Sequence, residues 1–436
     1  MTKLVHLLLG TACLLTAPAA KAETLADAIE AAYATNPTLG AAGARQDSLG
    51  ETIEQARATG RLTAAADAAG GYDRFDYGKG GAATISADLP IWTGGRVKSA
   101  VRAAKGDVAA GEEGLHDTRA AVLESVVGAY ADLLYDQQAV DIANADISLL
   151  DNQVAEARAR FKLGTSTKTD VARLEAQRAS AEATLASAQA SLATDAANYR
   201  ATVGHDPGTL APAPETLAAL PGTLDQARTR ALADNPLYRQ SQRVTEASAA
   251  RIDAARANGA PSLSLGGGYG YDANLAGSGD HAFPRASSAG VTLHVPILTG
   301  GLVASQVRQA RSDYRAAQFD GEASAREAIR STDAAWASFV SARAQATANA
   351  QGVAAADVAL KGVRAEYAFG LRSTLDILVA DESLRGAQLS LARNRSDILI
   401  AQAALLRATG HLDRDAFSVG PERTASASGK AWSSAL

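Results

Sequence analysis

The sequence offers almost no sulfur chemistry, because its 436 residues include one cysteine and one methionine. The cysteine, Cys13, lies within the first 22 residues, which have the features of a signal peptide. A lipid anchor on Cys13 is disfavoured because Gly10 stands where an aliphatic residue is expected. The mature chain is therefore expected to be free of cysteine, which excludes disulfides and thiol catalysis.

Other features are equally scarce. Aromatic residues make up only 5% of the chain, and acidic and basic residues are interspersed to a net charge of −5. No basic block suggests a nucleic-acid partner. The six histidines lack metal-ligand spacing, and neither a phosphate-binding loop nor a nucleophile elbow occurs, so neither an enzyme nor a cofactor or metal site is expected. No later segment reaches the ~18 apolar residues of a membrane-spanning helix.

The first 22 residues carry the three parts of a secretory signal. Lys3 supplies the positive start, residues 4–16 form a mostly apolar core, and Ala20-Lys21-Ala22 places small residues where a signal peptidase cleaves. The chain is therefore expected to leave the cytoplasm. Without a later apolar helix, it is free in the periplasm, outside the cell, or built into a β-barrel.

The remaining sequence repeats once. Asn36-Pro37 recurs 199 residues later as Asn235-Pro236, and Pro90-Ile91 recurs 206 residues later as Pro296-Ile297. The second copy thus has about seven extra residues between these landmarks, in an expected loop. We assign repeat 1 to residues 23–215 and repeat 2 to residues 216–413, and we expect residues 414–436 to be a disordered tail.

Each repeat predicts the same order of elements. A helix opens at Asn-Pro, and two strands with period-two alternation follow. After Thr-Gly-Gly comes a very long helix, broken by a glycine and followed by a returning helix with apolar residues at heptad spacing. The strands are expected at about 62–77, 82–92, 262–272 and 286–297, and the hairpin tips at 164–166 and 370–373.

Four strands cannot form a closed barrel by themselves. In a bilayer their open edges leave backbone groups unpaired, at a cost of several kcal/mol each. Closure needs further strands, and three copies would supply twelve. Aromatic residues of these strands are candidates either for an interfacial girdle or for ordinary strand packing: Tyr72, Phe75, Tyr77, Trp92, Tyr269 and Tyr271.

The ordered, duplicated set of motifs across residues 24–413 resembles the TolC family of outer-membrane efflux proteins. The resemblance implies a mainly α fold with a membrane β-barrel: a trimer forming a 12-stranded barrel and a periplasmic α-barrel tunnel. It also implies an outer-membrane location, contact with lipid, and docking onto a periplasmic adaptor (membrane fusion) protein and an inner-membrane RND or ABC pump. Such a chain is the exit duct of a tripartite efflux or type I secretion system.

The resemblance assigns roles to the two tips. Residues that resemble the family's adaptor-contacting loops are Leu163, Gly164, Thr165 and Ser166 in the first tip, and Phe369, Gly370, Leu371 and Ser373 in the second. Gly164 and Gly370 are also explained as helix C-cap glycines, and both interpretations can hold together.

A periplasmic gate is implied by four further residues. In the family, an arginine of the second tip pairs with an aspartate of the first tip on a neighbouring subunit, and Arg372 and Asp170 match those positions. Tyr367 matches a gate tyrosine, and Asp376 matches an acidic ring that favours cations. The best-known member of the family has a second acidic ring three residues further on, but Val379 stands at that position here, so strong cation affinity is not implied. The alternative for both aspartates is stabilisation of a helix N-terminus.

One other class of protein remains open at this point. An exported, trimeric coiled-coil structural or adhesin-like surface protein would explain the heptads and the signal peptide. It would not explain the strand pairs in the middle of each repeat. A passive porin would instead spend most of its length on strands.

Overall fold

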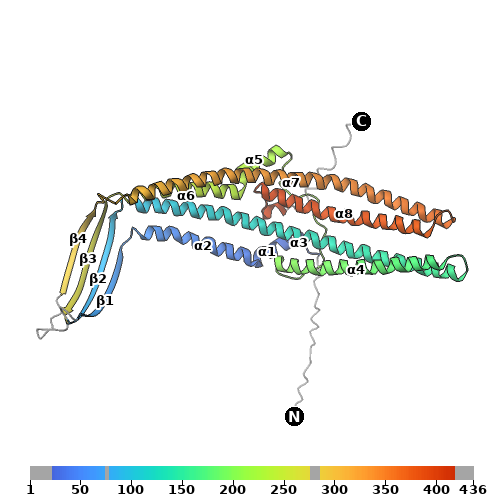
Figure 1. Ribbon diagram of the computed structural model, residues 1–436, viewed down its shortest axis with the longest axis horizontal. Coiled ribbons are helices and arrows are strands. Elements are labelled where there is room, and N and C mark those ends of the chain that lie inside the picture. The colour runs from blue at the N-terminus through green and yellow to red at the C-terminus, as the bar shows by residue number, and fades with distance from the viewer. Residues whose placement is uncertain (1–21, 74–77, 275–284, 418–436) are drawn as a thin grey trace, which may run out of the picture. The chain divides into compact units, whose positions relative to one another are not determined.

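The computed structural model describes residues 22–73, 78–274 and 285–417 (Figure 1). Cys13, nearly all of the expected signal peptide, Phe75, Tyr77 and residues 418–436 lie outside the described residues. The elements, in chain order, are α1 (Leu25–Thr35), α2 (Pro37–Ala58), β1 (Thr63–Asp73), β2 (Gly78–Trp92), α3 (Arg96–Lys162), α4 (Lys168–Val203), α5 (Leu224–Asp234), α6 (Pro236–Ala257), β3 (Ser262–Asn274), β4 (Arg285–His294), α7 (Leu302–Ala368), α8 (Thr374–Ala408) and a short 3-10 helix (Arg414–Phe417).

The two repeats build matching elements. Helices α2 and α6 have 22 residues each, and α3 and α7 have 67 residues each. Asn36 begins α2 by accepting the backbone N–H of Thr38 at 2.9 Å, and Asn235 begins α6 by accepting that of Tyr238 at 3.0 Å. Proline follows each asparagine because the first helical position needs no N–H donor. The expected architecture of two strands and long helical hairpins per repeat is confirmed.

The four strands form one antiparallel sheet in the order β1-β2-β3-β4. Its centre joins the two repeats, since Ile85 of β2 lies opposite Tyr269 of β3. Strand β4 ends at His294, three residues before the expected end. Pro296 follows closely, and a proline has no N–H to donate to a strand ladder.

The register sorts the side chains of the sheet onto two different faces. One face carries the large apolar residues, among them Ile85, Leu265, Val291 and Leu293, each more than two-fifths exposed. The opposite face carries small and polar residues, such as Asp67, Thr84 and Asp88 in β1 and β2 and glycines in β3. A sheet that is apolar on one side and polar on the other, with both sides open, fits lipid on one side and water on the other.

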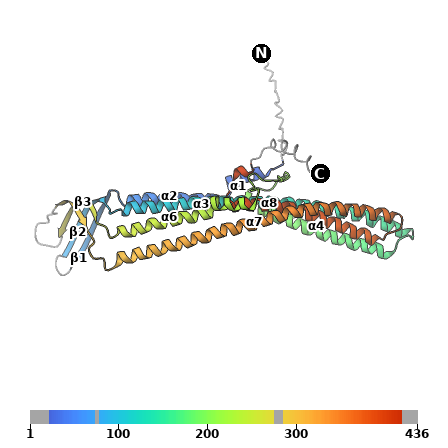
Figure 2. The same ribbon diagram turned by 90° about the horizontal axis from the view of Figure 1, so that it is seen from above.

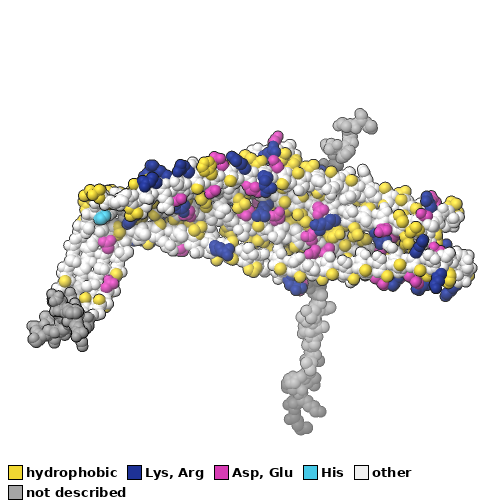
Figure 3. Space-filling view, viewed as in Figure 1, with side chains coloured by type: hydrophobic (Ala, Val, Ile, Leu, Met, Phe, Trp, Pro, Cys, Tyr) yellow, Lys and Arg dark blue, Asp and Glu magenta, His cyan; other side chains and the backbone are white. Residues whose placement is uncertain are grey.

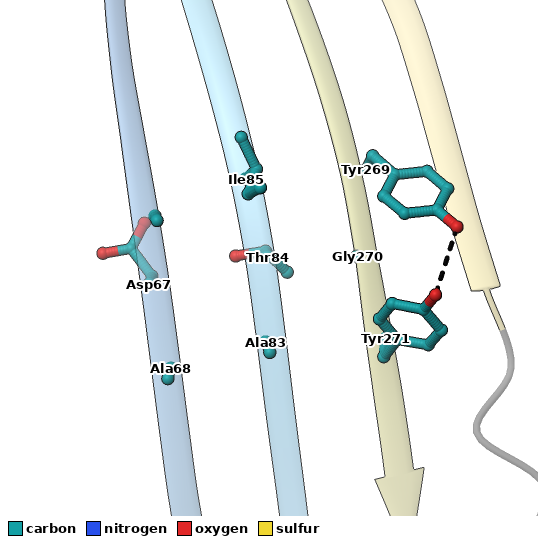
Figure 4. A pocket seen from close by; sticks show the side chains of 9 residues that line it. Asp67, Ala68, Ala83, Thr84, Ile85, Tyr269, Gly270 and Tyr271 are labelled. Carbon is teal, nitrogen blue, oxygen red and sulfur yellow. Dashed lines mark hydrogen bonds between the residues drawn. The ribbon is translucent and has the colours of Figure 1, made fainter.

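A shallow hollow on the sheet lies beside Tyr269 and Tyr271 (Figure 4). The two phenol oxygens are 3.3 Å apart, and the rings meet edge to face. Ile85 and Gly270 also line the hollow. No cluster of polar side chains converges there, so the hollow is a feature of strand packing and not a candidate catalytic site.

The chain divides into two compact units, and neither coincides with a sequence repeat. The first contains the described part of Met1–Thr35 with Val126–Glu215 and Val353–Ser396. In it, the glycine-broken ends of the two long helices pair with α4 and α8 (Figures 1 and 2). A core cluster from both hairpins holds them together: Leu150, Val154, Ala157, Leu174, Ala181 and Leu378.

The second unit contains the sheet together with α2, α5, α6, residues 96–125 of α3, residues 302–352 of α7 and the end of α8. Gln46 of α2 donates to the carbonyl of Val108 in α3, and Thr245 of α6 donates to that of Ala317 in α7. Between these pairs, a Cβ built on Gly106 of α3 lies 2.9 Å from the Cβ of Ala247 in α6. The four helices therefore follow the order α2-α3-α6-α7, parallel to the strand order.

The disordered tail was expected to begin at residue 414, but residues 414–417 are folded. Arg414–Phe417 form a 3-10 helix with Ala416 buried, and the Ala416 carbonyl accepts the N–H of Ala218 at 3.2 Å. Residues 414–417 are thus part of the fold, because this backbone contact and the buried methyl group hold them.

No helix among the described residues is both long enough and apolar enough to cross a bilayer. The helical surface instead mixes basic, acidic and apolar side chains along its length, whereas charged side chains are sparse on the visible side of the sheet (Figure 3).

Candidate functional site at the helical tips

The two tips share one backbone geometry. Gly164 donates its N–H to the carbonyl of Phe161 at 3.0 Å, and Thr165 donates to that of Arg160. Gly370 and Leu371 repeat these bonds at the second tip. Both glycines have left-handed φ angles, 77° and 74°, and a Cβ at either would meet nothing within 4 Å. They are therefore C-cap glycines, chosen for backbone conformation and not for close packing.

Apolar side chains project from the tips into solvent. Leu163 is 79% exposed, Phe369 is 83% exposed and Leu371 is 74% exposed. The polar tip residues Thr165 and Ser373 are also exposed, and Ser166 is half-buried. Exposed large apolar residues gathered on a turn mark a contact surface, because burying them against a partner is favourable.

Asp170 caps the start of α4. Its carboxylate accepts the Thr167 hydroxyl at 2.7 Å and the Thr167 N–H at 3.1 Å, while the Thr167 hydroxyl accepts the N–H of Asp170. These bonds from the Thr167 hydroxyl and N–H favour the charged form and lower the pKa of Asp170. Asp170 therefore stabilises the N-terminus of α4, which is the alternative role that the sequence analysis gave it. The same hydrogen bonds favour the ionised form of its carboxylate.

Asp376 repeats this arrangement at the start of α8. It accepts the N–H and the hydroxyl of Ser373, both at 2.8 Å, and the N–H bond is the main cause that lowers its pKa. Arg372 also lowers it, through charge alone. Val379, three residues further along, is 59% exposed. Two ionised aspartates, one per hairpin, thus stand at the tip ends of the returning helices.

Arg372 has its ion-pair partner within its own hairpin. Its Nε donates to Glu366 at 2.6 Å, which raises the pKa of the guanidinium. No contact joins Arg372 to Asp170 within the described chain. The pairing expected from the family joins neighbouring subunits, so it stays a prediction.

Tyr367 connects the two hairpins through a residue that sequence reasoning missed. Arg160 of α3 donates to the Tyr367 hydroxyl at 3.1 Å, and its guanidinium carbon lies 5.0 Å from the ring centroid. Arg160 and Glu366 are equivalent positions in the two repeats, each four residues before the tip glycine. The two repeats therefore carry opposite charges at this position, and that difference in the sequence could have singled out both Arg160 and Glu366.

A second missed feature is a buried ion network behind the tips. Arg385 of α8 pairs with Asp146 of α3, and its Nε lies 3.1 Å from Asp381. Asp381 in turn lies 3.5 Å from Arg364 of α7. The Asp146 and Asp381 side chains are only 2% and 6% exposed. Burial raises the pKa of Asp146, and Arg385 opposes that shift.

The links between the hairpins lie at regular intervals along α3. Asp132 pairs with Arg393, Asp146 with Arg385, and Arg160 with Tyr367. The three α3 positions are two heptads apart, so they share one face of a helix in a coiled coil. Only the middle link is buried, whereas the outer two are partly open to solvent.

Asp136 lies between two of these links and is itself only 5% exposed. Burial raises its pKa from 3.8 to about 6, and a hydrogen bond with Asp195 of α4 adds to the shift. Because the native state holds this proton more tightly, the group favours folding below pH 3.8, and that contribution is lost as the pH rises to about 6.

Replacing Asp136 by asparagine is expected to stabilise the protein above pH 6 by about 1 to 2 kcal/mol, because an amide needs no ionisation. Below pH 4 the substitution should have little effect. The thermal midpoint of the detergent-solubilised protein, measured at both pH values, checks this. Asp141→Asn, at an exposed position of the same helix, serves as the control. Equal shifts at the two pH values would contradict the assignment.

No group of histidine and acidic side chains capable of holding a metal ion occurs in residues 22–73, 78–274 and 285–417.

Comparison with known proteins matches both repeats to one family. The model of the family described as outer membrane efflux protein matches residues 28–205 and 227–411. Outer membrane efflux protein BepC from Brucella suis is 32% identical over 412 residues, covering 94% of this chain and 90% of that protein. Outer membrane protein TolC from Vibrio cholerae is 27% identical over 310 residues, or 68% of this chain and 69% of that protein.

A solved structure agrees with these matches. The outer membrane protein VceC from Vibrio cholerae superposes with a TM-score of 0.73 at 26% identity, covering 88% of this chain and 96% of that chain. The residues that the family model matches include helices and strands of both repeats. A purely structural coiled-coil protein does not account for it.

Proposed function

Because the chain belongs to the outer membrane efflux protein family, we propose that it works as a homotrimer forming one duct, docked to a periplasmic adaptor and an inner-membrane RND or ABC pump. The chain is an outer-membrane channel of a tripartite efflux or type I secretion system, with a periplasmic helical extension, and is not an enzyme.

The single observation that carries the trimer is the pair of open edges in the second unit. Strands β1 and β4 each have a neighbour on one side only, and every residue of β4 is exposed. Helix α2 has no buried residue at all, and α7 exposes Phe319 and Val340. Backbone groups at an open strand edge cannot remain unpaired in a bilayer. Pairing β4 with β1 of another copy satisfies them, and three copies make a barrel of twelve strands.

The two faces of the sheet support this closure. With the apolar face outward, Leu265 and Val291 contact lipid, whereas Asp67, Thr84 and Asp88 line an aqueous interior. The inward residues are small, which leaves the interior open for cargo. Trp92, 51% exposed at the end of β2, suits the boundary between lipid and water.

The gate is proposed at the tips. The capping bonds lower the pKa values of Asp170 and Asp376, and Arg372 lies on an exposed turn. We assign closure to Arg372 pairing with Asp170 of the next subunit, with Tyr367 bracing the two hairpins and Asp376 forming an acidic ring. The exposed apolar residues Leu163, Phe369 and Leu371 would then contact the adaptor.

Single-channel recording in planar bilayers tests this function. Wild-type protein is expected to give a small, cation-preferring conductance, because ionised aspartates surround a narrow opening. Arg372→Ser should raise the conductance several-fold, because it removes the cation that ties the tip of one subunit to the next. Arg326→Ser, which removes another exposed arginine, on α7, should leave the conductance unchanged.

Absence of conductance from both proteins, despite intact trimers, would sink the channel assignment. Equal conductance of wild type and Arg372→Ser would leave a channel but place its gate elsewhere.

A further inference from the structure

One charged side chain stands on the apolar face of the sheet. The register places Arg285 of β4 opposite Tyr271 of β3, on the same face as Leu293. Among the strand residues whose side chains the structure describes, Arg285 is the only charged residue on that face, because Asp67 and Asp88 lie on the other. A charge that faces lipid is costly in the middle of a membrane and much less so at its boundary, so the depth of Arg285 matters.

Arg285 lies at the outer end of the sheet. Strand β4 begins at Arg285 and leads toward α7, and the helices of this outer-membrane family extend into the periplasm. Arg285 precedes Leu293 by eight residues, and Leu293 lies level with Trp92 through their shared neighbour Leu263. At about 3.4 Å per residue and a tilt of about 40°, this stretch rises about 20 Å through an apolar band about 25 Å tall. With Trp92 at the inner boundary, the long Arg285 side chain reaches the outer boundary.

The Arg285 side chain is held by an aromatic ring. Its guanidinium carbon lies 5.7 Å from the centroid of the Tyr271 ring, and Arg285 is exposed and forms no ion pair with any described residue. Tyr269 and Tyr271 present hydroxyl groups 3.3 Å apart on the same face (Figure 4). Their mutual hydrogen bond uses the proton of one hydroxyl, so the other can still donate. A guanidinium beside a hydroxyl donor suits an anionic oxygen group.

The anion that suits this place is a lipid phosphate. The described aspartates of the sheet are on the opposite face, so the apolar face offers Arg285 no carboxylate. The planar guanidinium matches two oxygens of a phosphate group. At the outer boundary of an outer membrane, phosphate is carried by the sugars of the glycolipid that forms the outward leaflet, whereas phospholipid headgroups gather at the inner boundary.

We infer that Tyr269, Tyr271 and Arg285 form a binding site for a phosphorylated glycolipid of the outward leaflet. Arg285 pairs with a phosphate, the Tyr271 ring holds the guanidinium in place, and a tyrosine hydroxyl donates to the same anion. The site rests on the proposed function, which turns the apolar face of the sheet toward lipid.

Titration of lipid A into the detergent-solubilised protein, followed by native mass spectrometry, tests this site. Lipid A with its phosphates intact is the probe. Arg285→Ser is expected to weaken its binding about tenfold or more, as for the loss of a hydrogen bond to a charged group. Lipid A stripped of phosphate should bind wild type and Arg285→Ser alike. The control Arg326→Ser, which removes an exposed arginine of α7, should bind lipid A as wild type does.

Tyr271 acts as a positioning residue, and two variants separate its ring from its hydroxyl. Tyr271→Leu should weaken lipid A binding about two- to fivefold, because Arg285 loses the ring that holds it. Tyr271→Phe keeps the ring and should retain most of the affinity, because the Tyr269 hydroxyl is then free to donate. Equal losses for the two variants would contradict the role of the ring.

The remaining outcomes identify the ligand and separate the site from the channel. Equally tight binding of phosphatidylglycerol, or displacement of lipid A by inorganic phosphate, would overturn the assignment to a glycolipid. Wild-type protein that conducts in planar bilayers but binds lipid A no better than Arg285→Ser would overturn the site and leave the channel standing. Protein that shows the expected difference in binding but never conducts would count against the proposed function alone.

Discussion

Replacing Arg385 by leucine is expected to destabilise the protein by about 3 to 5 kcal/mol, the range for removing one partner of a buried ion pair. The Asp146 carboxylate is 2% exposed; burial raises its pKa, and the charge of Arg385 opposes that shift. Asp381 is affected less, because Arg364 remains beside it at 3.5 Å. Thermal unfolding of the detergent-solubilised protein, followed by far-ultraviolet circular dichroism, measures the loss.

Two further variants identify the cause. Arg158→Leu removes an arginine whose pair with Glu175 is 60% and 44% exposed, and it should cost less than about 1 kcal/mol. The double variant Asp146→Leu with Arg385→Leu should regain much of the stability, since apolar residues of similar size replace a buried pair at little cost. A loss for Arg385→Leu no larger than that for Arg158→Leu would refute the buried network as a source of stability.

The second large effect is expected at Gly410, which ends α8. A Cβ there would lie 2.1 Å from the carbonyl oxygen of Asp234, and the φ angle of 76° is one that other residues rarely adopt. Gly410→Ala should therefore cost about 1 kcal/mol for the backbone conformation, and about 1 to 3 kcal/mol more for overlap with a main chain that cannot move freely. The same thermal unfolding experiment applies.

Gly370 provides the matched control for this substitution. Its φ angle of 74° is almost the same, but a Cβ would enter open space. Gly370→Ala should therefore show only the conformational cost of about 1 kcal/mol. Similar losses at the two glycines would mean that the contact with Asp234 contributes nothing.

Local features of the tips could be predicted because they depend on nearby residues. Gly164 and Gly370 follow long periodic stretches, and Asp170 and Asp376 stand six residues beyond them in both repeats. Each aspartate bonds to a hydroxyl-bearing residue three positions earlier, so the capping contact is encoded within one helical turn.

The partners of the arginines could not be predicted in the same way. Asp146 and Arg385 are 239 residues apart, and no periodicity relates one to the other. The family resemblance directed attention to Asp170 as the partner of Arg372, whereas within the chain Arg372 meets Glu366. Which charged side chains form ion pairs depends on how the two hairpins are rotated against each other. A charged residue on a helix face has several possible partners on the other hairpin.

The sequence by itself determined the duplicated order of helices and strands, the positions of both tips and the existence of two open edges, because periodicity, capping residues and turn glycines act over short distances. Only the tertiary structure decided which side chains link the hairpins, that Arg414–Phe417 belong to the fold, and which strand positions lie opposite each other across the repeats. Those features arise from contacts between segments far apart in the chain. The energies of such contacts depend on burial and strand register, and both exist only once the segments have packed.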